Sequence, residues 1–407
     1  MSDAELSRLL LSLVLLLSFS LGGGQIFSLL RLPRVIGEIC AGLLLGPSIL
    51  GYLFPDLYAW IFHGFEEQGK LLSVFYWLGL ILLMFTAGFK ISTTFIKSDR
   101  LLILTLILGG MGLPFLFGFL ASPLFPNSVS ANPLAFSLIM AIASAVTSIP
   151  VLTRIFMDID MLTSRFAQAV LTAAAIQDLI LWLVLSVAIS IQQEQILGFA
   201  SIIPIVINTI AFAVFSVVMV PTLLRFAGRA VALQSPEGAL LGYTLLVCLI
   251  LVSMASVLQV NIVFGALLAG LVIGRLPASR LEQVKLNIAN IANWFFVPMY
   301  FALVGLQINL PTNFNAALVF GFLLASSLIK VASVMCLTKF TRISWVGALD
   351  FGVTMNTRGG PGIVLASVAY AAKIIDEPLF VALVLASILT SLMTGVWLRW
   401  RRVAITA

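Results

Sequence analysis

Asp178 is the residue of this chain whose type and position point most directly to chemistry. It follows Gln177 inside an otherwise apolar run, residues 166–191, which is long enough to cross a bilayer as a helix. A charged carboxylate costs about 3 kcal/mol or more at the centre of a membrane, so an acid in this position is by default a functional site. The alternative is an Asp that is satisfied by hydrogen bonds and only fixes helix packing.

The functional interpretation of Asp178 rests on simple acid–base and coordination chemistry. Burial raises the pKa of a carboxylate, so a buried acid can release and regain a proton near neutral pH. Without the proton, its oxygens suit a hard cation such as sodium or potassium. Gln177 adds a neutral amide oxygen, although successive side chains of a helix diverge. We therefore predict a transporter without a cofactor, in which a proton and a metal cation compete for Asp178.

Lys330 is a second charged residue within an apolar segment. It lies nine residues before Lys339, which is about 14 Å along a helix. In one interpretation its long stem lets the ammonium reach the membrane interface. In the other, Lys330 is a partner for Asp178, or occupies the site when no cation is bound.

The fifth apolar segment contains Ser144, Thr147, Ser148 and Pro150. Pro150 lacks a backbone donor and disturbs the preceding turn. Freed carbonyls and the three hydroxyl groups offer further oxygens for a cation. The alternative is an ordinary proline kink with small residues that allow close helix packing.

The twelfth segment carries the sequence Asn356-Thr357-Arg358-Gly359-Gly360-Pro361-Gly362 at its centre. Such a run cannot remain regular helix, and irregular backbone at this depth is tolerated only inside protein or beside a cavity. Asp350 and Arg358 flank the break and are candidates to pair. In the alternative reading, Arg358 neutralises Asp350 or a helix end and has no role in transport.

Composition places these residues in an all-α membrane protein. The chain of 407 residues is 61% hydrophobic and 9% charged, whereas soluble domains carry about 25% charged residues. The alternation typical of a barrel strand is absent, so the spans are predicted to be helices. About thirteen transmembrane helices are predicted, at 6–30, 34–54, 71–92, 101–123, 133–157, 165–191, 197–226, 237–257, 261–274, 284–307, 315–338, 343–373 and 378–399.

The order of the spans predicts an internal repeat. Six helices (residues 6–191) precede a linker helix at 197–226, and six follow it (residues 237–399). The fifth member of each set is interrupted, and matching interrupted helices are the pattern of two inverted repeats around a transport site. The chain, 1–407, is therefore expected to be a single membrane domain, with no soluble regulatory domain and no cleavable signal peptide.

The positive charges predict the orientation. Loops on one side, together with the C-terminal Arg399, Arg401 and Arg402, hold 17 of the Lys and Arg residues, and the other side holds 3. Because Lys and Arg are enriched in cytoplasmic loops, the C-terminus is predicted to be cytoplasmic and the N-terminus external, in the inner membrane. The net charge of +6 reflects this bias and does not indicate nucleic-acid binding.

Three other functions are weighed against exchange. A channel for potassium efflux is one. A sodium-coupled symporter for an organic anion, with Arg358 as the anion contact, is another. An intramembrane enzyme is not supported, because the single histidine, His63, falls in a predicted external loop and no metal-ligand pattern appears.

Taken together, several motifs resemble the second branch of the monovalent cation/proton antiporters, which includes bacterial sodium/proton antiporters and glutathione-gated potassium efflux systems. The matching features cover nearly the whole chain; they are Pro33–Glu38 running to Gly42–Ser48, Gly79–Gly88, the Ser/Thr-rich fifth span, Gln177-Asp178, Phe295–Pro298 through Val304-Gly305, Lys330 and Arg358-Gly359.

The resemblance implies a homodimer in which a core domain moves against a dimerisation domain and two discontinuous helices cross near the ion site. It implies that Asp178 carries the ion or the proton, with Thr147 and Ser148 on the first crossing helix. Lys330 then lies opposite the site and Arg358 on the second crossing helix, with Asn356, Asp350 and Ser144 as supporting residues.

Three positions depart from the family pattern. Gln177 stands where electrogenic sodium members have an acid, which is the pattern of potassium-efflux-type and electroneutral members. Gly360 replaces a frequent Glu, and Phe89-Lys90 replaces an acid after the third span. The resemblance therefore implies exchange of one cation for one proton.

Overall fold

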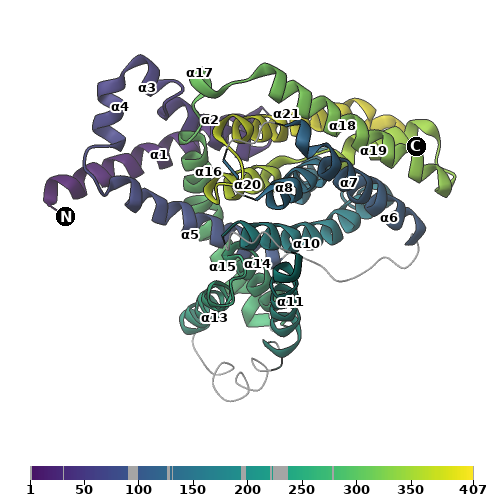
Figure 1. Cartoon of the computed structure of the whole chain (residues 1–407), viewed down its shortest axis with the longest axis horizontal. Helices are drawn as coiled ribbons and strands as arrows, with labels where there is room; N and C mark the ends of the chain where they lie inside the picture. Colours follow the sequence, from purple (N-terminus) through teal and green to yellow (C-terminus); the bar gives the residue numbers. More distant parts are fainter. Residues whose placement is uncertain are drawn as a thin grey trace. The chain divides into compact units, whose positions relative to one another are not determined.

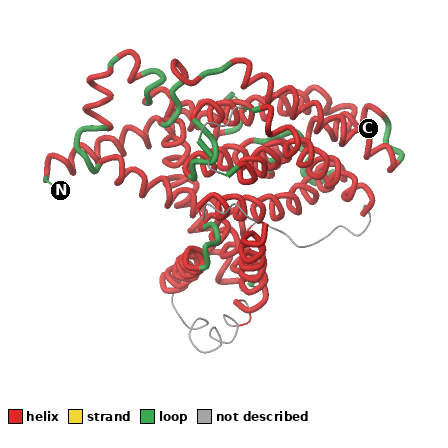
Figure 2. Tube along the Cα trace, in the orientation of Figure 1, coloured by secondary structure: helices red, strands yellow, loops and turns green. Residues whose placement is uncertain are grey.

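The computed structural model describes residues 2–30, 32–89, 100–125, 129–130, 132–193, 199–220, 222, 237–276 and 279–406. Every regular element in these residues is helical, and loops join the helices (Figures 1 and 2). Ten helices among them are long and apolar enough to cross a membrane, and three shorter apolar helices accompany them. The all-helical membrane architecture expected from composition is confirmed.

The chain divides into two compact units. Unit 1 comprises Met1–Gln25, Gly37–Ile91 and Leu197–Ile308, and unit 2 comprises Ile26–Ile36, Ser92–Ile196 and Asn309–Ala407. Each unit thus contains parts of both predicted repeats. All the residues predicted to form the site lie in unit 2.

Unit 1 contains most of α1 and the helices from α2 to α5 and α11 to α16. Their bounds are α1 Asp3–Leu29, α2 Arg34–Leu45, α3 Leu50–Leu53, α4 Pro55–Phe62, α5 Gln68–Phe89, α11 Phe199–Val214, α13 Glu237–Val257, α14 Ile262–Gly274, α15 Ser279–Ile291 and α16 Val297–Leu306. Helices α5 and α14 pack closely because glycines face the opposing backbone. A Cβ on Gly88 would stand 2.5 Å from the carbonyl oxygen of Leu267. Small residues of this kind allow membrane helices to approach each other.

Unit 2 contains the remaining helices. Their bounds are α6 Arg100–Ile107, α7 Leu113–Ala121, α8 Pro133–Ala145, α9 Ile149–Asp158, α10 Arg165–Gln193, α17 Leu310–Asn313, α18 Ala316–Thr338, α19 Trp345–Met355, α20 Gly359–Ala371 and α21 Glu377–Thr406. Buried side chains from α6, α9, α10, α18, α19 and α21 form one apolar cluster, which includes Leu106, Phe156, Val170, Phe351 and Met355. This cluster supports the two interrupted helices from one end.

In the part of the chain that the structure describes, helices lie in each of the thirteen predicted spans, but three spans are each divided into a pair of separate helices. The predicted span 34–54 is α2 and α3, 133–157 is α8 and α9, and 343–373 is α19 and α20. Some residues used for the orientation, such as Lys90, Lys97, Arg225 and Arg229, lie outside the described residues, as does part of the predicted linker 197–226.

Candidate functional site

The first interruption separates α8 from α9 at Val146, Thr147 and Ser148. Helix α8 begins at Pro133, where Asn132 Oδ1 accepts hydrogen bonds from the N–H groups of Leu134 and Ala135 at 3.0 and 3.3 Å. It ends at Ala145, because Val146 has an extended ψ of 139°. Pro150 lies in the first turn of α9, where its missing N–H has no helical partner to lose. The proline therefore lies in the first turn of a second helix. The alternative interpretation of the sequence, an ordinary kink within one continuous helix, is not what the structure has.

The second interruption separates α19 from α20 at residues 356–358 and meets the first. Ser148 N–H donates to the carbonyl oxygen of Thr357 at 2.7 Å, and Thr147 Oγ1 lies 3.0 Å from the carbonyl oxygen of Met355. Gly359 has φ +46°, and a Cβ there would stand 2.6 Å from Ser148 Oγ. Only glycine allows this backbone conformation and this close approach together. In Figure 1, α8 and α20 accordingly lie side by side.

Lys330 of α18 is fully buried and ends at the first interruption. Its Nζ donates to the carbonyl oxygens of Ala145 and Val146, both at 2.7 Å, and to Thr147 Oγ1 at 2.9 Å. Three acceptors match the three N–H groups of an ammonium, and positive charge is favourable at the C-terminal end of a helix such as α8. Two of the carbonyls freed by the break are therefore already engaged.

This placement decides between the two interpretations of Lys330 drawn from the sequence. The side chain does not reach the membrane interface, because none of its surface is exposed. Lys330 and Asp178, both among the described residues, form no ion pair within 4.0 Å. They are close enough to interact electrostatically. Lys330 is therefore a neighbour of Asp178 whose hydrogen bonds go to the broken helix.

Gln177 of α10 joins the interruption to a third helix. Its Oε1 lies 3.0 Å from Thr147 Oγ1, and its Nε2 donates to the carbonyl oxygen of Leu106 at 3.1 Å. The Thr147 hydroxyl has one proton, so it donates either to Gln177 or to Met355 while it accepts from Lys330. Gln177 is completely buried, and both ends of its amide are used within the protein.

Asp178 lies on a different side of α10 from Gln177, as expected for successive helical positions. The side chain is partly exposed, but its Oδ1 atom is buried and accepts no hydrogen bond from any described residue. Ser148 Oγ is also buried without a partner among the described residues. Buried polar atoms are usually hydrogen-bonded, so these two oxygens are acceptors of the site whose bonding capacity is unused among the described residues.

Arg358 is the second buried cation of the site. It is 1% exposed and lies at the N-terminal end of α20. Its Nη2 donates to Asn356 Oδ1 at 3.5 Å, and its Cζ lies 5.1 Å from the centre of the Phe322 ring. Two other nitrogens, Nε and Nη1, have no hydrogen-bond partner among the described residues.

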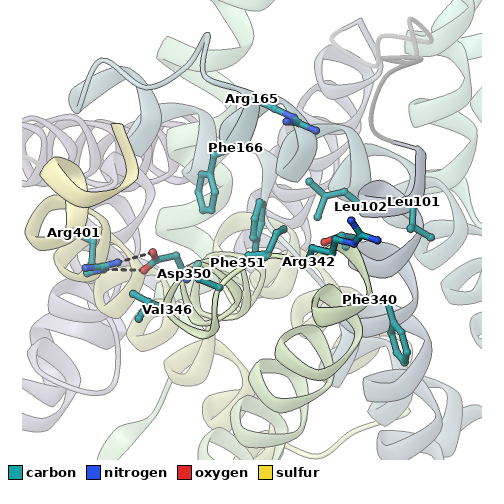
Figure 3. Close-up of a pocket in the computed structure, with 14 residues that line it drawn as sticks. Leu101, Leu102, Arg165, Phe166, Phe340, Arg342, Val346, Asp350, Phe351 and Arg401 are labelled. Atoms are coloured by element: carbon teal, nitrogen blue, oxygen red, sulfur yellow. Dashed lines mark hydrogen bonds and ion pairs between the residues drawn. The ribbon is translucent and has the colours of Figure 1, made fainter. Parts of the chain in front are cut away.

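Asp350 does not pair with Arg358, so the pairing considered from the sequence is wrong. Asp350 accepts hydrogen bonds from Arg401 Nε at 3.1 Å, Arg401 Nη2 at 3.0 Å and Trp397 Nε1 at 3.0 Å. The two-point contact between Asp350 and Arg401 is visible in Figure 3. A planar guanidinium favours this geometry. Asp350 lies in the middle of α19, before the break that follows Met355.

Several supporting residues were not found from the sequence. Thr357 Oγ1 donates to Thr394 Oγ1 at 2.9 Å, and Arg358 N–H donates to Thr390 Oγ1 at 3.4 Å, so α21 holds the second interruption. A π-helical turn, Leu108–Gly112, interrupts α6 and α7 beside Gln177. The glycines of Leu108-Gly109-Gly110-Met111-Gly112 were the available signal for that irregularity. Ser144, named from the sequence as a supporting residue, is buried in α8.

Comparison with known proteins gives the family. The profile of the family described as "Sodium/hydrogen exchanger, transmembrane" matches residues 14–401. The K(+)/H(+) antiporter 1 of Saccharomyces cerevisiae is 30% identical over 90% of this chain and 43% of the relative, and the Cation/H(+) antiporter 18 of Arabidopsis thaliana is 27% identical over 90% and 45%. The chain thus spans about half the length of these curated relatives.

A shorter relative and a solved structure match along most of their length. The High-affinity Na(+)/H(+) antiporter NhaS3 of Synechocystis is 28% identical over 97% of this chain and 90% of the relative. The structure of the sodium proton antiporter MjNhaP1 from Methanocaldococcus jannaschii has a TM-score of 0.69 at 17% identity and covers 99% of both chains, which shows a common fold. The family match confirms the resemblance seen in the motifs and the prediction of a transporter rather than an enzyme. The chain belongs to the transmembrane sodium/hydrogen exchanger family.

Proposed function

We propose that this protein exchanges a monovalent cation, sodium or potassium, for protons by alternating access, and that Asp178 carries either ion. The observation that supports this most is the buried Oδ1 of Asp178, which accepts no hydrogen bond from any described residue. In the same unit, Asp350 is fully engaged by Arg401 and Trp397. Asp178 is therefore the carboxylate with capacity for a ligand, and relatives of the chain are named as cation/proton antiporters.

The coordination we propose differs in emphasis from the one drawn from the sequence. Ser148 Oγ has an unused acceptor beside the interruption, so we assign it with Asp178 to the cation. The hydroxyl of Thr147 and the amide of Gln177 are committed to each other, to Lys330 or to backbone carbonyls. They act as positioning groups that hold the interruption against α10.

A single titrating carboxylate favours exchange of one cation for one proton. Gln177 replaces the second acid of electrogenic members and is neutral, so a proton and a monovalent cation on Asp178 exchange without net charge. Changing Gln177→Asp adds a second acid at the same place. We expect exchange by this variant to depend on membrane potential, whereas exchange by the wild type does not. Equal voltage dependence of the two proteins, measured with membrane potentials set by a gradient of a permeant anion such as thiocyanate, would count against this stoichiometry.

Further features of the proposal follow from the family. We propose thirteen membrane crossings arranged as two inverted repeats, a homodimer, an external N-terminus and a cytoplasmic C-terminus. The matching positions of the two interrupted helices, α8–α9 and α19–α20, support the repeats. Because the proposed site lies wholly within unit 2, we assign unit 2 to the core domain that carries the ion.

The decisive experiment is Asp178→Asn in proteoliposomes. An amide can neither carry a proton nor supply a negative charge to a cation, so we expect both sodium-driven and potassium-driven proton movement to fall to the level of empty vesicles. Asp56→Asn is the matched control, because Asp56 is exposed in the short helix α4. Exchange by Asp178→Asn at the wild-type rate would exclude the assignment. Comparison of the two cations in the wild type identifies the substrate.

A further inference from the structure

A cavity of about 900 Å³ opens in unit 2 at the end opposite to the interruption of α19. Its walls come from the first turns of α6, α10 and α19, the connection between α18 and α19, and the last part of α21. Its volume is in the range of small-molecule sites, roughly 300–1,000 Å³. The cavity is separate from Asp178, Ser148 and Lys330, none of which lines it.

The charges of this cavity are those of an anion site. Three arginines from three different segments line it, Arg165, Arg342 and Arg401, against one carboxylate, Asp350. Asp350 is already neutralised by the two-point contact with Arg401. Figure 3 shows Phe166 and Phe351 at the centre, with the Asp350–Arg401 pair on one side and Arg342 on the other. Such a lining repels sodium and potassium, so the cavity does not suit the transported cation.

Arg342 is the residue whose position most favours a ligand. It is exposed, its backbone has φ +62°, and it follows the short helix that ends α18. No hydrogen bond or ion pair of its guanidinium is found among the described residues. Arg165 lies at the first position of α10, so the positive end of that helix adds to the field. The aromatic floor of the cavity, Phe166 and Phe351, has its ring centres 4.4 Å apart.

We propose that this cavity binds a phosphate-bearing anion through Arg342, with Arg165 adding positive charge to the same wall. Guanidinium groups recognise phosphate by paired charge-assisted hydrogen bonds, and the apolar floor accommodates the uncharged part of the ligand. The phosphate belongs either to an anionic lipid headgroup or to a soluble phosphate compound, since both present the same chemistry.

The floor of the cavity lies close to the hydrogen bonds of the ion site. Leu102 and Phe351 line the cavity, and Leu106 and Met355 follow them by one helical turn, about 6 Å. The carbonyl oxygens of Leu106 and Met355 contact Gln177 and Thr147. A ligand in the cavity therefore contacts α6 and α19 one turn away from the groups that position the interruption.

The test measures ligand-induced stabilisation of the purified full chain in detergent, because a ligand that binds the folded state raises its unfolding temperature. Two probes separate the sources. Inorganic pyrophosphate, as its Tris salt, represents a soluble phosphate, with Tris chloride at equal ionic strength as control. Dioleoylphosphatidic acid represents a lipid headgroup, with dioleoylglycerol as the control that lacks phosphate. Stabilisation by either probe over its own control supports the proposal and names the source.

Variants tie the binding to the cavity. Loss of a charge-assisted hydrogen bond costs about 1.5–3 kcal/mol, so Arg342→Gln should weaken binding by about tenfold or more. Arg165→Gln removes a nearby positive charge and should weaken binding to a smaller extent. Arg275→Gln is the matched control, because Arg275 is an exposed arginine of unit 1 and should leave binding unchanged. If one cavity variant does not fold, the other carries the test. No stabilisation by either probe, or equal weakening by Arg275→Gln, would overturn the proposal.

Discussion

The two interrupted helices meet in the same place but are stabilised in different ways. At the first interruption, the C-terminal end of α8 receives a buried ammonium, and Lys330 donates to two carbonyl oxygens and one hydroxyl. At the second, the carbonyl groups at the C-terminal end of α19 contact neutral groups of the described residues, which are the hydroxyls of Thr147 and Thr394 and the N–H of Ser148. The difference shows that one interruption depends on a charge from another helix, while the other depends on hydroxyl and backbone groups.

The two buried cations of the site, Lys330 and Arg358, differ in how many of their hydrogen-bond donors have a partner. All three donors of Lys330 are matched with acceptors, whereas Arg358 leaves two of its nitrogens without a partner among the described residues. A buried charge is stabilised when its hydrogen bonds are made and is costly when they are not. Lys330 should therefore matter more to stability than Arg358, although both are buried to the same degree.

Lys330→Met should produce the largest effect. The change leaves the carbonyls of Ala145 and Val146 without their donor, and each buried acceptor left unsatisfied costs about 1–3 kcal/mol. We expect a marked fall in the midpoint of thermal unfolding in detergent and loss of exchange. Lys339→Met is the control, because Lys339 lies directly after α18 and makes one hydrogen bond, to the carbonyl of Ile343, and a contact with the Trp345 ring. An equal fall in both variants would contradict the special role of Lys330.

The sequence predicted the existence of the two interruptions but not how each is held. Pro150 and residues Gly359–Gly362 predict where a regular helix cannot continue, because proline and glycine act on the backbone locally. Lys330 and Asp178 stood out because charge is rare in apolar segments. The partners of Lys330 could not be predicted, since they are two backbone carbonyls and one hydroxyl that lie 183 to 185 positions away in the sequence.

The failed pairing of Asp350 illustrates the same limit. Arg358 is eight residues from Asp350 and looked like a partner, whereas the actual partner, Arg401, is 51 positions away. Proximity in the sequence favours a contact only when one continuous helix joins the two residues. Here α19 ends at Met355, so Arg358 leaves the helical register that Asp350 follows. The last turns of α21, predicted only as a cytoplasmic end, supply the arginine.

Removing the hydrogen bond between Thr357 and Thr394 at the second interruption should lower the free energy of unfolding by a smaller amount. Thr357→Val and Thr394→Val each remove one side of a buried hydrogen bond of 2.9 Å, which contributes about 1 kcal/mol. In a double-mutant cycle on thermal unfolding, the two changes should couple by about 0.5–1.5 kcal/mol. Thr209→Val combined with Thr394→Val is the control and should show additive effects, because Thr209 bonds only within its own helix in unit 1. Additive effects of Thr357→Val and Thr394→Val would show that this hydrogen bond does not stabilise the second interruption.

Arg358→Met should have the smallest effect on stability. Whether it raises or lowers the unfolding midpoint is the sharpest test of the contrast between Arg358 and Lys330. The arginine contributes a long 3.5 Å hydrogen bond and a contact with the Phe322 ring, while methionine fills a similar volume without a buried charge. Replacing an unmatched buried charge by an apolar side chain is often neutral or stabilising. We therefore expect an unfolding midpoint equal to or above that of the wild type. Arg401→Met, which leaves the buried Asp350 without its ion pair, should lower it. A larger loss for Arg358→Met than for Arg401→Met would mean that Arg358 holds a strong partner, and the contrast with Lys330 would fail.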